Sequence, residues 1–275
     1  MIYTKRIFLH AENTVPAFEK RLSICLKTNG FSFSITDTKN VLYTFGEVDC
    51  LFPESLAEVI NGIKQIFTSL NVSVSGYKST ELIMPSQKQT WIPEHLFTDG
   101  KEKEYLTALC DANTSESYFS NKVDYIQACS VFAVSNTLSS GWKIAIPSAK
   151  IKDQFSKMVE FPCLKNNRVG ISVAAFVREE EIDIAVFDSG RFLFSNTFKF
   201  EQQEDLVYFV LNVVKQLKLQ ESKVTVYLAG KVLMTTFDEF RKFFANVKLE
   251  KINTLKPANE QLKAVARHEY ALILS

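Results

Sequence analysis

Residues 169–231 decide the fold of this chain, and they read VGISVAAFVREEEIDIAVFDSGRFLFSNTFKFEQQEDLVYFVLNVVKQLKLQESKVTVYLAGK. In the first half of this stretch, apolar and polar residues alternate around two short turns, which predicts three consecutive β-strands. Apolar residues then recur at helical spacing from about residue 204 to 217. The run 224–230 is short and mostly apolar, as is typical of a strand inside a sheet. The predicted order is strand, strand, strand, helix, strand.

The same order of patterns occurs about 150 positions earlier, at residues 22–78. The predicted strands that begin at Phe31 and Ile182 are 182 − 31 = 151 positions apart, and the predicted helices are 150 apart. Val72 and Val224, in the predicted closing strands, are 224 − 72 = 152 apart. Few residues are identical, so chance agreement between alternating strands is an alternative. Because two turns, a helix and a strand keep their spacing, we predict an internal duplication.

A chain of 275 residues that is 46% apolar can bury two cores of ordinary size, and the repeat predicts two lobes. We predict an N-terminal lobe at residues 1–165, with an inserted segment at about 86–165, and a C-terminal lobe at residues 166–275. Residues 142–147 (WKIAIP) are predicted to form a strand. The 23 phenylalanines are predicted to fill the cores, with an aromatic binding platform as the alternative.

Charge and cysteine content exclude some classes of protein. The chain has 32 basic and 31 acidic residues, so its net charge of +1 provides no overall attraction to nucleic acid or to an anionic membrane. Its five cysteines are odd in number and form no CxxC pair, which indicates reduced, buried thiols. No apolar run is long enough for a signal core or a membrane span. We therefore expect a soluble, cytoplasmic protein.

Several short motifs point to a known fold. They are GFSFSI at residues 30–35, ELIMP at 81–85 followed by PEHLF at 93–97, NTFKFEQQEDLVYFVL at 196–211 and VYLAGKV at 226–232. Together with the repeat, they resemble a family of uncharacterised Bacteroidetes proteins, a domain of unknown function with an actin-like ATPase fold. The resemblance implies a bacterial α/β protein with mixed sheets, in the duplicated, ribonuclease H-like architecture of two lobes.

Actin-like ATPases hold a nucleotide between their lobes, so the resemblance implies a site. Their phosphates and metal ion lie at the first hairpin turn of each lobe, in motifs of the type Asp-x-Gly-x-Thr. Glycine lets backbone N–H groups approach phosphate oxygens, and the aspartate holds Mg²⁺. This chain has Leu26 or Lys27 where the aspartate is expected, and residues 178–181 (REEE) replace the second glycine run. Three carboxylates there repel a polyphosphate.

Five residues are candidate nucleotide contacts if the cleft binds a nucleotide. Three lie at the first turn and two at the turn that packs on adenosine in actin-like ATPases: Lys27, Asn29, Gly30, Gly230 and Lys231. We favour structural interpretations, in which Lys27 and residues 178–181 are solvated turn residues. Asn29 and Gly30 are typical of a tight hairpin, and Gly230 ends a buried strand. No catalytic residue, metal ligand or cofactor is predicted.

Two further features each have a structural and a functional interpretation. Asp37 and Asp188 occupy repeat-related turns, where we predict that they accept backbone hydrogen bonds; an acid and base pair is the alternative. The run from residue 241 to 267 is basic and includes Lys248 and Lys251. Because exposed aromatic residues do not alternate with these charges, a solvated face is favoured over a nucleic-acid-binding face.

These features lead to a functional hypothesis. The chain is predicted to be a non-catalytic actin-like protein, a pseudo-ATPase that has lost ATP hydrolysis and acts by binding another macromolecule, in the first place a protein. The alternative from the enzyme class is a divergent ATPase or kinase that uses Lys27 and Gly230 in the inter-lobe cleft. An RNA-binding role of Lys248 and Lys251 is a weaker alternative.

Overall fold

The computed structural model describes residues 3–12, 15–111, 114–165, 169–250, 252 and 255–275. The chain divides into two compact units. Unit 1 comprises Met1–Gln154 and Asn253–Val265, and unit 2 comprises Phe155–Ile252 and Ala266–Ser275. The boundary predicted between residues 165 and 166 adjoins residues 166–168, which lie outside the described residues, so it stays a prediction.

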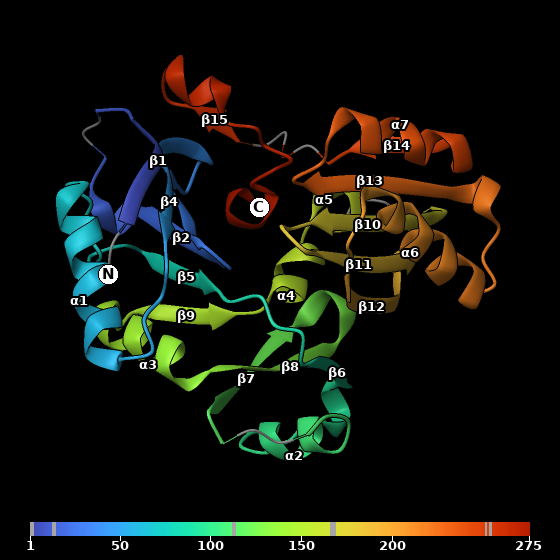
Figure 1. The fold of residues 1–275 in the computed structure, drawn as a ribbon, viewed down its shortest axis with the longest axis horizontal. Coiled ribbons are helices and arrows are strands. Elements are labelled where there is room, and N and C mark those ends of the chain that lie inside the picture. Colours follow the sequence, from blue (N-terminus) through green and yellow to red (C-terminus); the bar gives the residue numbers. More distant parts are fainter. Residues whose placement is uncertain (1–2, 13–14, 112–113, 166–168, 251, 253–254) are drawn as a thin grey trace. The chain divides into compact units, whose positions relative to one another are not determined.

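Unit 1 is built on a large mixed sheet (Figure 1). In spatial order its strands are β1 (Tyr3–His10), β4 (Val41–Cys50), β3 (Gly30–Asp37), β2 (Lys20–Lys27), β5 (Ser79–Ile83) and β9 (Ala149–Lys152), and β15 (Lys256–Pro257) pairs with β4. The first four are antiparallel to one another, whereas β2, β5 and β9 are parallel. The helical elements of this part are α1 (Leu56–Ser69), α3 (Asn136–Ala145), η1 (Ala17–Glu19) and η5 (Gln261–Ala264).

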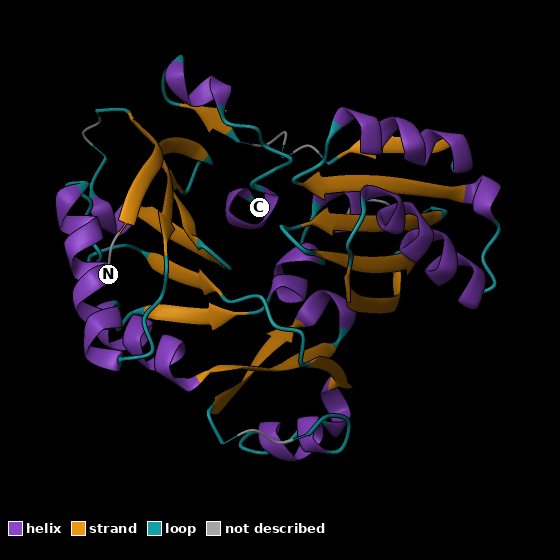
Figure 2. Cartoon of the chain, viewed as in Figure 1, coloured by secondary structure: helices purple, strands orange, loops and turns teal. Residues whose placement is uncertain are grey.

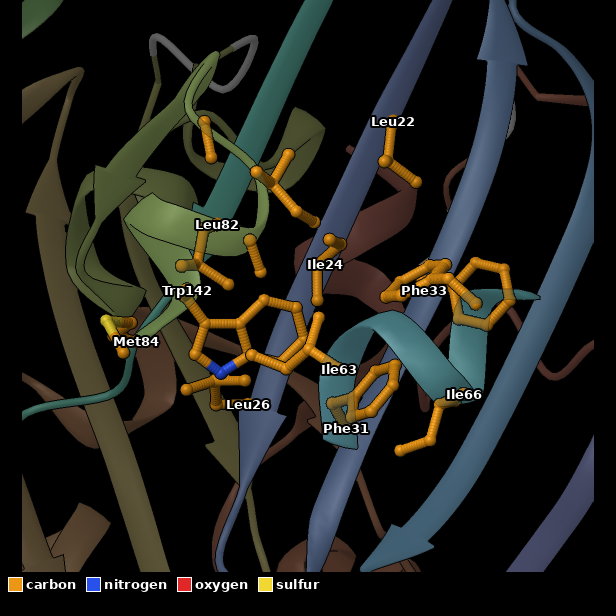
Figure 3. Packing of buried hydrophobic residues seen from close by; sticks show 14 of the residues in the cluster. Leu22, Ile24, Leu26, Phe31, Phe33, Ile63, Ile66, Leu82, Met84 and Trp142 are labelled. Carbon is orange, nitrogen blue, oxygen red and sulfur yellow. The ribbon is translucent and has the colours of Figure 1, made fainter. Parts of the chain in front are cut away.

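Aromatic and aliphatic side chains pack together in the core of unit 1 (Figure 3). Phe31 and Phe33 on β3, Phe67 on α1 and Trp142 on α3 are each at most 1% exposed. The Trp142 ring meets the Phe31 ring edge-on, with 5.2 Å between centroids, and such pairs add roughly 1 kcal/mol to the burial of their area. For these residues, the prediction that phenylalanines fill the core is confirmed.

The prediction of a strand at residues 142–147 is wrong, because this region belongs mainly to α3. The Ser135 side chain accepts the Leu138 N–H at the start of the helix, at 3.4 Å. A glycine in this helix lets α3 approach α1 closely. A Cβ at Gly141 would overlap the Val59 side chain, so the glycine serves helix packing.

A three-stranded antiparallel sheet forms a second part of unit 1. It orders β6 (Gln89–Pro93), β8 (Ala128–Ser135) and β7 (Glu116–Val123), with α2 (Glu102–Thr107), η2 (Glu94–Leu96) and η3 (Asp124–Ile126) in its connections. Leu106 and Val131 form a small core of their own there. The segment predicted to be inserted therefore contains a sheet that has no counterpart among the described residues of unit 2.

Unit 2 contains a five-stranded mixed sheet. Its order is β12 (Arg191–Lys199), β11 (Glu181–Asp188), β10 (Ile171–Val177), β13 (Val224–Gly230) and β14 (Asn246–Leu249). Its helical elements are α4 (Gln154–Met158, whose first residue belongs to unit 1), α5 (Pro162–Lys165), α6 (Gln203–Gln216), η4 (Glu221–Lys223), α7 (Met234–Phe243) and α8 (Ala271–Leu274). Figure 2 colours the helices of the chain purple and its strands orange. No helix among the described residues is long and apolar enough to cross a bilayer.

The two large sheets share strand order, direction and register. β4-β3-β2-β5-β9 and β12-β11-β10-β13-β14 have the same sequence of antiparallel and parallel neighbours. Leu26 faces Phe31 across one hairpin, and Val177 faces Ile182 across the other, at the predicted shift of 151. A register irregularity recurs as well, between Ile35 and Thr36 in one unit and between Val186 and Phe187 in the other.

Beyond the hairpins, two predicted shifts are wrong. α1 and α6 have equal length and start at Leu56 and Gln203, a shift of 203 − 56 = 147, almost one helical turn short of 150. Val72 lies outside any strand, and the closing strand of unit 1 is β5. Leu82 faces Ile24 as Leu228 faces Ala175, which gives 228 − 82 = 146.

Candidate functional site

The first hairpin turn of unit 1 is tight and its backbone is in use. Lys27 pairs with Gly30, so Thr28 and Asn29 form the turn itself. The Asn29 carbonyl accepts the N–H of Cys50 at 3.0 Å. The hairpin is therefore confirmed, and both Lys27 and Gly30 are strand residues at its mouth.

Lys27 forms an ion pair with Glu47 of β4. The lysine side chain is 16% exposed and the glutamate side chain 5%. Breaking a pair this deeply buried leaves a charge without compensation, which costs far more than breaking a surface pair. The prediction that Lys27 is simply solvated is wrong, because its ammonium group is held by a buried carboxylate.

Gly30 is required by the backbone of its neighbouring strand. Its φ angle is +138°, a conformation that side chains with a Cβ rarely adopt, and a Cβ there would overlap the Val48 carbonyl oxygen. Gly30 thus lets β3 and β4 approach each other. This packing accounts for the glycine without a phosphate ligand.

The turn of unit 2 is held by a denser set of charges. Arg178 donates two hydrogen bonds to Asp183, at 2.8 and 2.9 Å, in the bidentate geometry of a guanidinium on a carboxylate. Thr197 donates its hydroxyl to the same carboxylate at 2.6 Å, and Arg178 also forms an ion pair with Glu181. The Asp183 side chain is fully buried. The side chains of Arg178 and Glu181 are only 16% and 13% exposed, so the prediction of a solvated turn is wrong for them.

Gly230 and Lys231 lie beside this turn. Gly230 ends β13, as predicted, and its φ of +81° and its closeness to the Val177 carbonyl exclude a Cβ. The Gly230 N–H donates to the His268 carbonyl and the Lys231 N–H to the Val177 carbonyl, both at 2.8 Å. The Lys231 ammonium is 2.9 Å from the Glu179 carboxylate. These backbone donors and this cation are therefore engaged within unit 2.

The registers place the two ion-paired cations at equivalent positions. Lys27 and Arg178 are 178 − 27 = 151 sequence positions apart, which equals the shift between the two hairpins. The next equivalent feature is a cross-strand pair, Ser32 with Glu47 in unit 1 and Asp183 with Thr197 in unit 2. Each pair combines one hydroxyl with one acid, but the acid has changed strands. Both units therefore neutralise the cation at the hairpin with a buried carboxylate.

The second turns of the two units differ. Asp37 is buried and accepts the N–H groups of Lys39 at 2.8 Å and Val41 at 2.9 Å, as predicted for a turn former. Burial acts to raise its pKa, but these backbone hydrogen bonds and the Tyr43 hydroxyl outweigh it and hold the pKa below its ordinary value of 3.8. Asp188 accepts the Ser189 hydroxyl at 3.0 Å.

The basic run near the C-terminus contains one carboxyl group that is not a surface charge. Glu250 is buried, and burial raises its pKa in spite of hydrogen bonds from the Cys163 side chain and backbone. The Lys248 ammonium lies 5.8 Å from the centre of the Tyr227 ring. Lys251 is outside the described residues. The nucleic-acid-binding face proposed for Lys248 and Lys251 therefore stays a prediction.

The structure groups the five candidate residues by unit. Unit 1 holds Lys27, Asn29 and Gly30 at one turn, and unit 2 holds Gly230 and Lys231 beside another. Sequence reasoning missed the carboxylates that bind the two hairpin cations, Glu47 and Asp183. Within the described part of the chain, no group of three His, Cys, Asp or Glu side chains is arranged to hold a metal ion.

Comparison with known proteins identifies the fold. A Bacteroides thetaiotaomicron protein with an actin-like ATPase fold and unknown function is similar, with a TM-score of 0.72 and 24% identity; the match covers 90% of this chain and 96% of that chain. A chain of the PilM–PilN type IV pilus biogenesis complex matches with a TM-score of 0.56 and 10% identity, over 94% of this chain and 97% of that one.

The ethanolamine utilization protein EutJ from Carboxydothermus hydrogenoformans has a TM-score of 0.50 and 10% identity, with 90% of this chain and 89% of that chain covered. A search of curated protein sequences found no match. The model of one protein family matches residues 12–247. The chain thus has an actin-like ATPase fold and belongs to the family described as "Protein of unknown function (DUF3822)".

Proposed function

We propose that this protein is a pseudo-ATPase, an internally duplicated actin-like protein that has lost ATP hydrolysis and acts by binding another protein. The observation that carries the proposal is the ion-paired cation at each first hairpin turn. Lys27 is bound by Glu47, and Arg178 is bound by Asp183. In actin-like ATPases these turns hold the phosphates and the metal ion, whereas here buried carboxylates lie next to them.

Electrostatics and backbone geometry support the loss of nucleotide hydrolysis. At each turn, the cation that could attract a polyphosphate is already neutralised by a buried carboxylate, so its charge is not available to bind phosphate. The glycines Gly30 and Gly230 face neighbouring carbonyl oxygens, and the Gly230 N–H already has an acceptor. The chemistry that a phosphate turn needs, free N–H groups and a metal-binding aspartate, is therefore replaced by internal bonds.

Two of the similar proteins support a protein partner and an origin in Bacteroidetes, and the sheets themselves support the duplication. A chain of the PilM–PilN type IV pilus biogenesis complex has a similar fold, which supports a role in binding another protein. The similarity to a Bacteroides thetaiotaomicron protein supports an origin in Bacteroidetes. The shared strand order, register and irregularity of the two sheets support the duplication.

Calorimetric titration of the full chain with Mg-ATP, together with a phosphate-release assay, tests the loss of hydrolysis. We expect no saturable binding below about 1 mM, which corresponds to a binding free energy weaker than about 4 kcal/mol, and no phosphate release above the protein-free rate. The rival ATPase predicts micromolar binding with turnover, abolished in Lys27→Ala but retained in Lys248→Ala. That second pattern would refute the proposal.

A further inference from the structure

The outer edge of β4 in unit 1 is covered along its length (Figure 1). β1 pairs antiparallel with β4 from Thr44 to Cys50, and β15 pairs with Val41 and Leu42. The backbone groups that an end strand would otherwise expose are thus used within the sheet. Covering an edge in this way prevents pairing with other chains.

β12 holds the equivalent position in unit 2, and its outer edge has no covering strand among the described residues. It stands at the end of its sheet and pairs with β11. In the described part of the chain, β11 is also the one element that contacts β12 extensively. β12 is therefore the edge of its sheet, whereas the equivalent β4 is an inner strand.

The two end strands differ in how they are protected. β1 has exposed charges at Lys5 and Arg6 and an irregular register between Lys5 and Ile7, which are common devices against unwanted strand pairing. In β12, the run from Phe192 to Phe198 (FLFSNTF) contains neither a charge nor a proline. Its one irregularity lies near the start, opposite Val186 and Phe187.

β12 is also held in place before anything binds to it. The Phe198 ring stacks on Phe209 of α6 with 4.9 Å between centroids, and the Phe192 ring packs edge-on against Phe187 at 5.4 Å. Leu193 and Phe194 pack partly against the core of unit 2. A rigid strand pays less entropy on binding than a disordered one, so this edge is pre-organised.

One hydrogen bond shows which amides face the outer edge. The Thr197 N–H donates to the Asn196 side-chain oxygen at 2.9 Å, not to β11. Because backbone groups alternate in direction along a strand, the Ser195 amide faces the same side as that of Thr197. A backbone carbonyl of an added strand would take the place of the Asn196 side-chain oxygen as the acceptor of the Thr197 N–H.

The ends of β12 determine what can pair with it. Arg191 and Lys199 are exposed, and the strand contains no acid. A second copy that paired antiparallel about Ser195 would put its Lys199 opposite Arg191, since 191 + 199 = 2 × 195. Like charges in opposed positions destabilise a strand pair, so the charges favour a different chain with acids at its ends.

We propose that the outer edge of β12 binds an extended, acidic-ended segment of a partner protein as an added antiparallel strand. The proposal rests on the proposed function, in which this chain acts by binding a protein, and it names the surface and the chemistry of the partner. The antiparallel direction follows the pairing of β1 with β4, the strand equivalent to β12. In such a complex, backbone hydrogen bonds contribute affinity and alternate side chains contribute selectivity.

A designed peptide tests the assignment on the full chain. The probe is fluorescein-labelled Glu-Thr-Val-Thr-Phe-Thr-Val-Thr-Glu, and its control has lysine in place of both glutamates; binding is measured by fluorescence anisotropy. We expect the lysine-ended peptide to bind about tenfold more weakly, which equals roughly 1.4 kcal/mol. Ser195→Pro removes an outward N–H and is expected to weaken the acidic peptide by a similar factor relative to Ser195→Ala.

A charge reversal keeps the test decisive if the proline variant does not fold. Arg191→Glu combined with Lys199→Glu should make the lysine-ended peptide the tighter one. Equal binding of both peptides, or no binding of either, overturns the assignment. So does a dimer in sedimentation velocity that Ser195→Pro dissociates, because that result identifies a second copy as the occupant. Nucleotide turnover in the Mg-ATP assay would instead refute the proposed function and leave the peptide result unaffected.

Discussion

Lys27 in unit 1 and Arg178 in unit 2 hold equivalent positions at the mouths of two hairpins, and each is bound by a buried acid. The acid lies on β4 in unit 1, as Glu47, and on β11 in unit 2, as Asp183. β11 is equivalent to β3, so the two acids lie on non-equivalent strands. Under the proposed duplication, a ligand inherited unchanged would keep the acid on the same strand. The two units instead share a charge-balanced ion pair at the turn, with the acid on different strands.

The two pairs differ in strength as well as in layout. Lysine offers a compact charge on a flexible chain, whereas the planar guanidinium of Arg178 matches the Asp183 carboxylate with two parallel hydrogen bonds. Asp183 also receives the Thr197 hydroxyl. The Arg178–Asp183 pair therefore has the more favourable geometry, and we expect unit 2 to lose more stability than unit 1 when its acid is removed.

Removal of Asp183 should have the largest effect. Asp183→Ala removes the bidentate partner of Arg178 and a carboxylate that accepts the Thr197 hydroxyl, so we expect the free energy of unfolding to fall by about 4 kcal/mol. Urea unfolding followed by far-ultraviolet circular dichroism measures it. Asp183→Asn keeps the size and should lose less. A loss below about 1 kcal/mol would show that the pair behaves as a surface ion pair.

Substitution at the two glycines tests whether strand packing explains them. Gly30→Ala and Gly230→Ala should each cost roughly 3 kcal/mol, because an unfavourable φ is combined with overlap on a carbonyl oxygen. Gly100→Ala is the matched control, since Gly100 has a φ of +82° and open space at its Cβ. It should cost about 1 kcal/mol. Thermal unfolding measures the differences, and equal losses at all three positions would contradict the packing argument.

Glu47→Ala should cost less than Asp183→Ala, by the comparison between the two turns. Lys27 loses one partner and its flexible side chain can extend towards water, so we expect a loss of about 2 kcal/mol in the free energy of unfolding. Replacing both partners, as Lys27→Met with Glu47→Leu, should be nearly neutral because no buried charge is left behind. Fluorescence of the two tryptophans, Trp91 and Trp142, reports on this unit in urea. A double variant less stable than Glu47→Ala would contradict the expectation.

Much of the strand order and both hairpin registers were predictable from the sequence. Alternation has a period of two, so a slip of one residue would turn every apolar side chain to the wrong face, and the shift of 151 was well determined. The helix offset was not, because a slip of three residues nearly restores the apolar face of α1 on α6. The run VSVS at residues 72–75 imitates a strand, but Asn71 has a φ of +54° and the chain turns there.

The ion pairs were not predictable because their partners are set by tertiary packing. Lys27 and Glu47 are 20 residues apart and meet only because β3 brings β2 and β4 to either side of itself. Asp183 in the run IDIAVF was interpreted as one polar position of an alternating strand, although it is fully buried. A signal was present: a charged residue inside an apolar strand, five positions after an arginine at the turn.

The smallest effect concerns the second turns, where Asp37 accepts two backbone N–H groups and Asp188 accepts one side-chain hydroxyl. Asp37→Ala should lower the free energy of unfolding by about 1 kcal/mol at pH 7, and Asp188→Ala by less. The folded pKa of Asp37 is lower than its ordinary value of 3.8, so its ionised form stabilises the fold above about pH 4 and this contribution is lost as the pH falls through the folded pKa. The gap between wild type and Asp37→Ala should therefore shrink in urea titrations from pH 7 towards pH 3. A gap that widened in acid would contradict a lowered pKa of Asp37 in the folded protein.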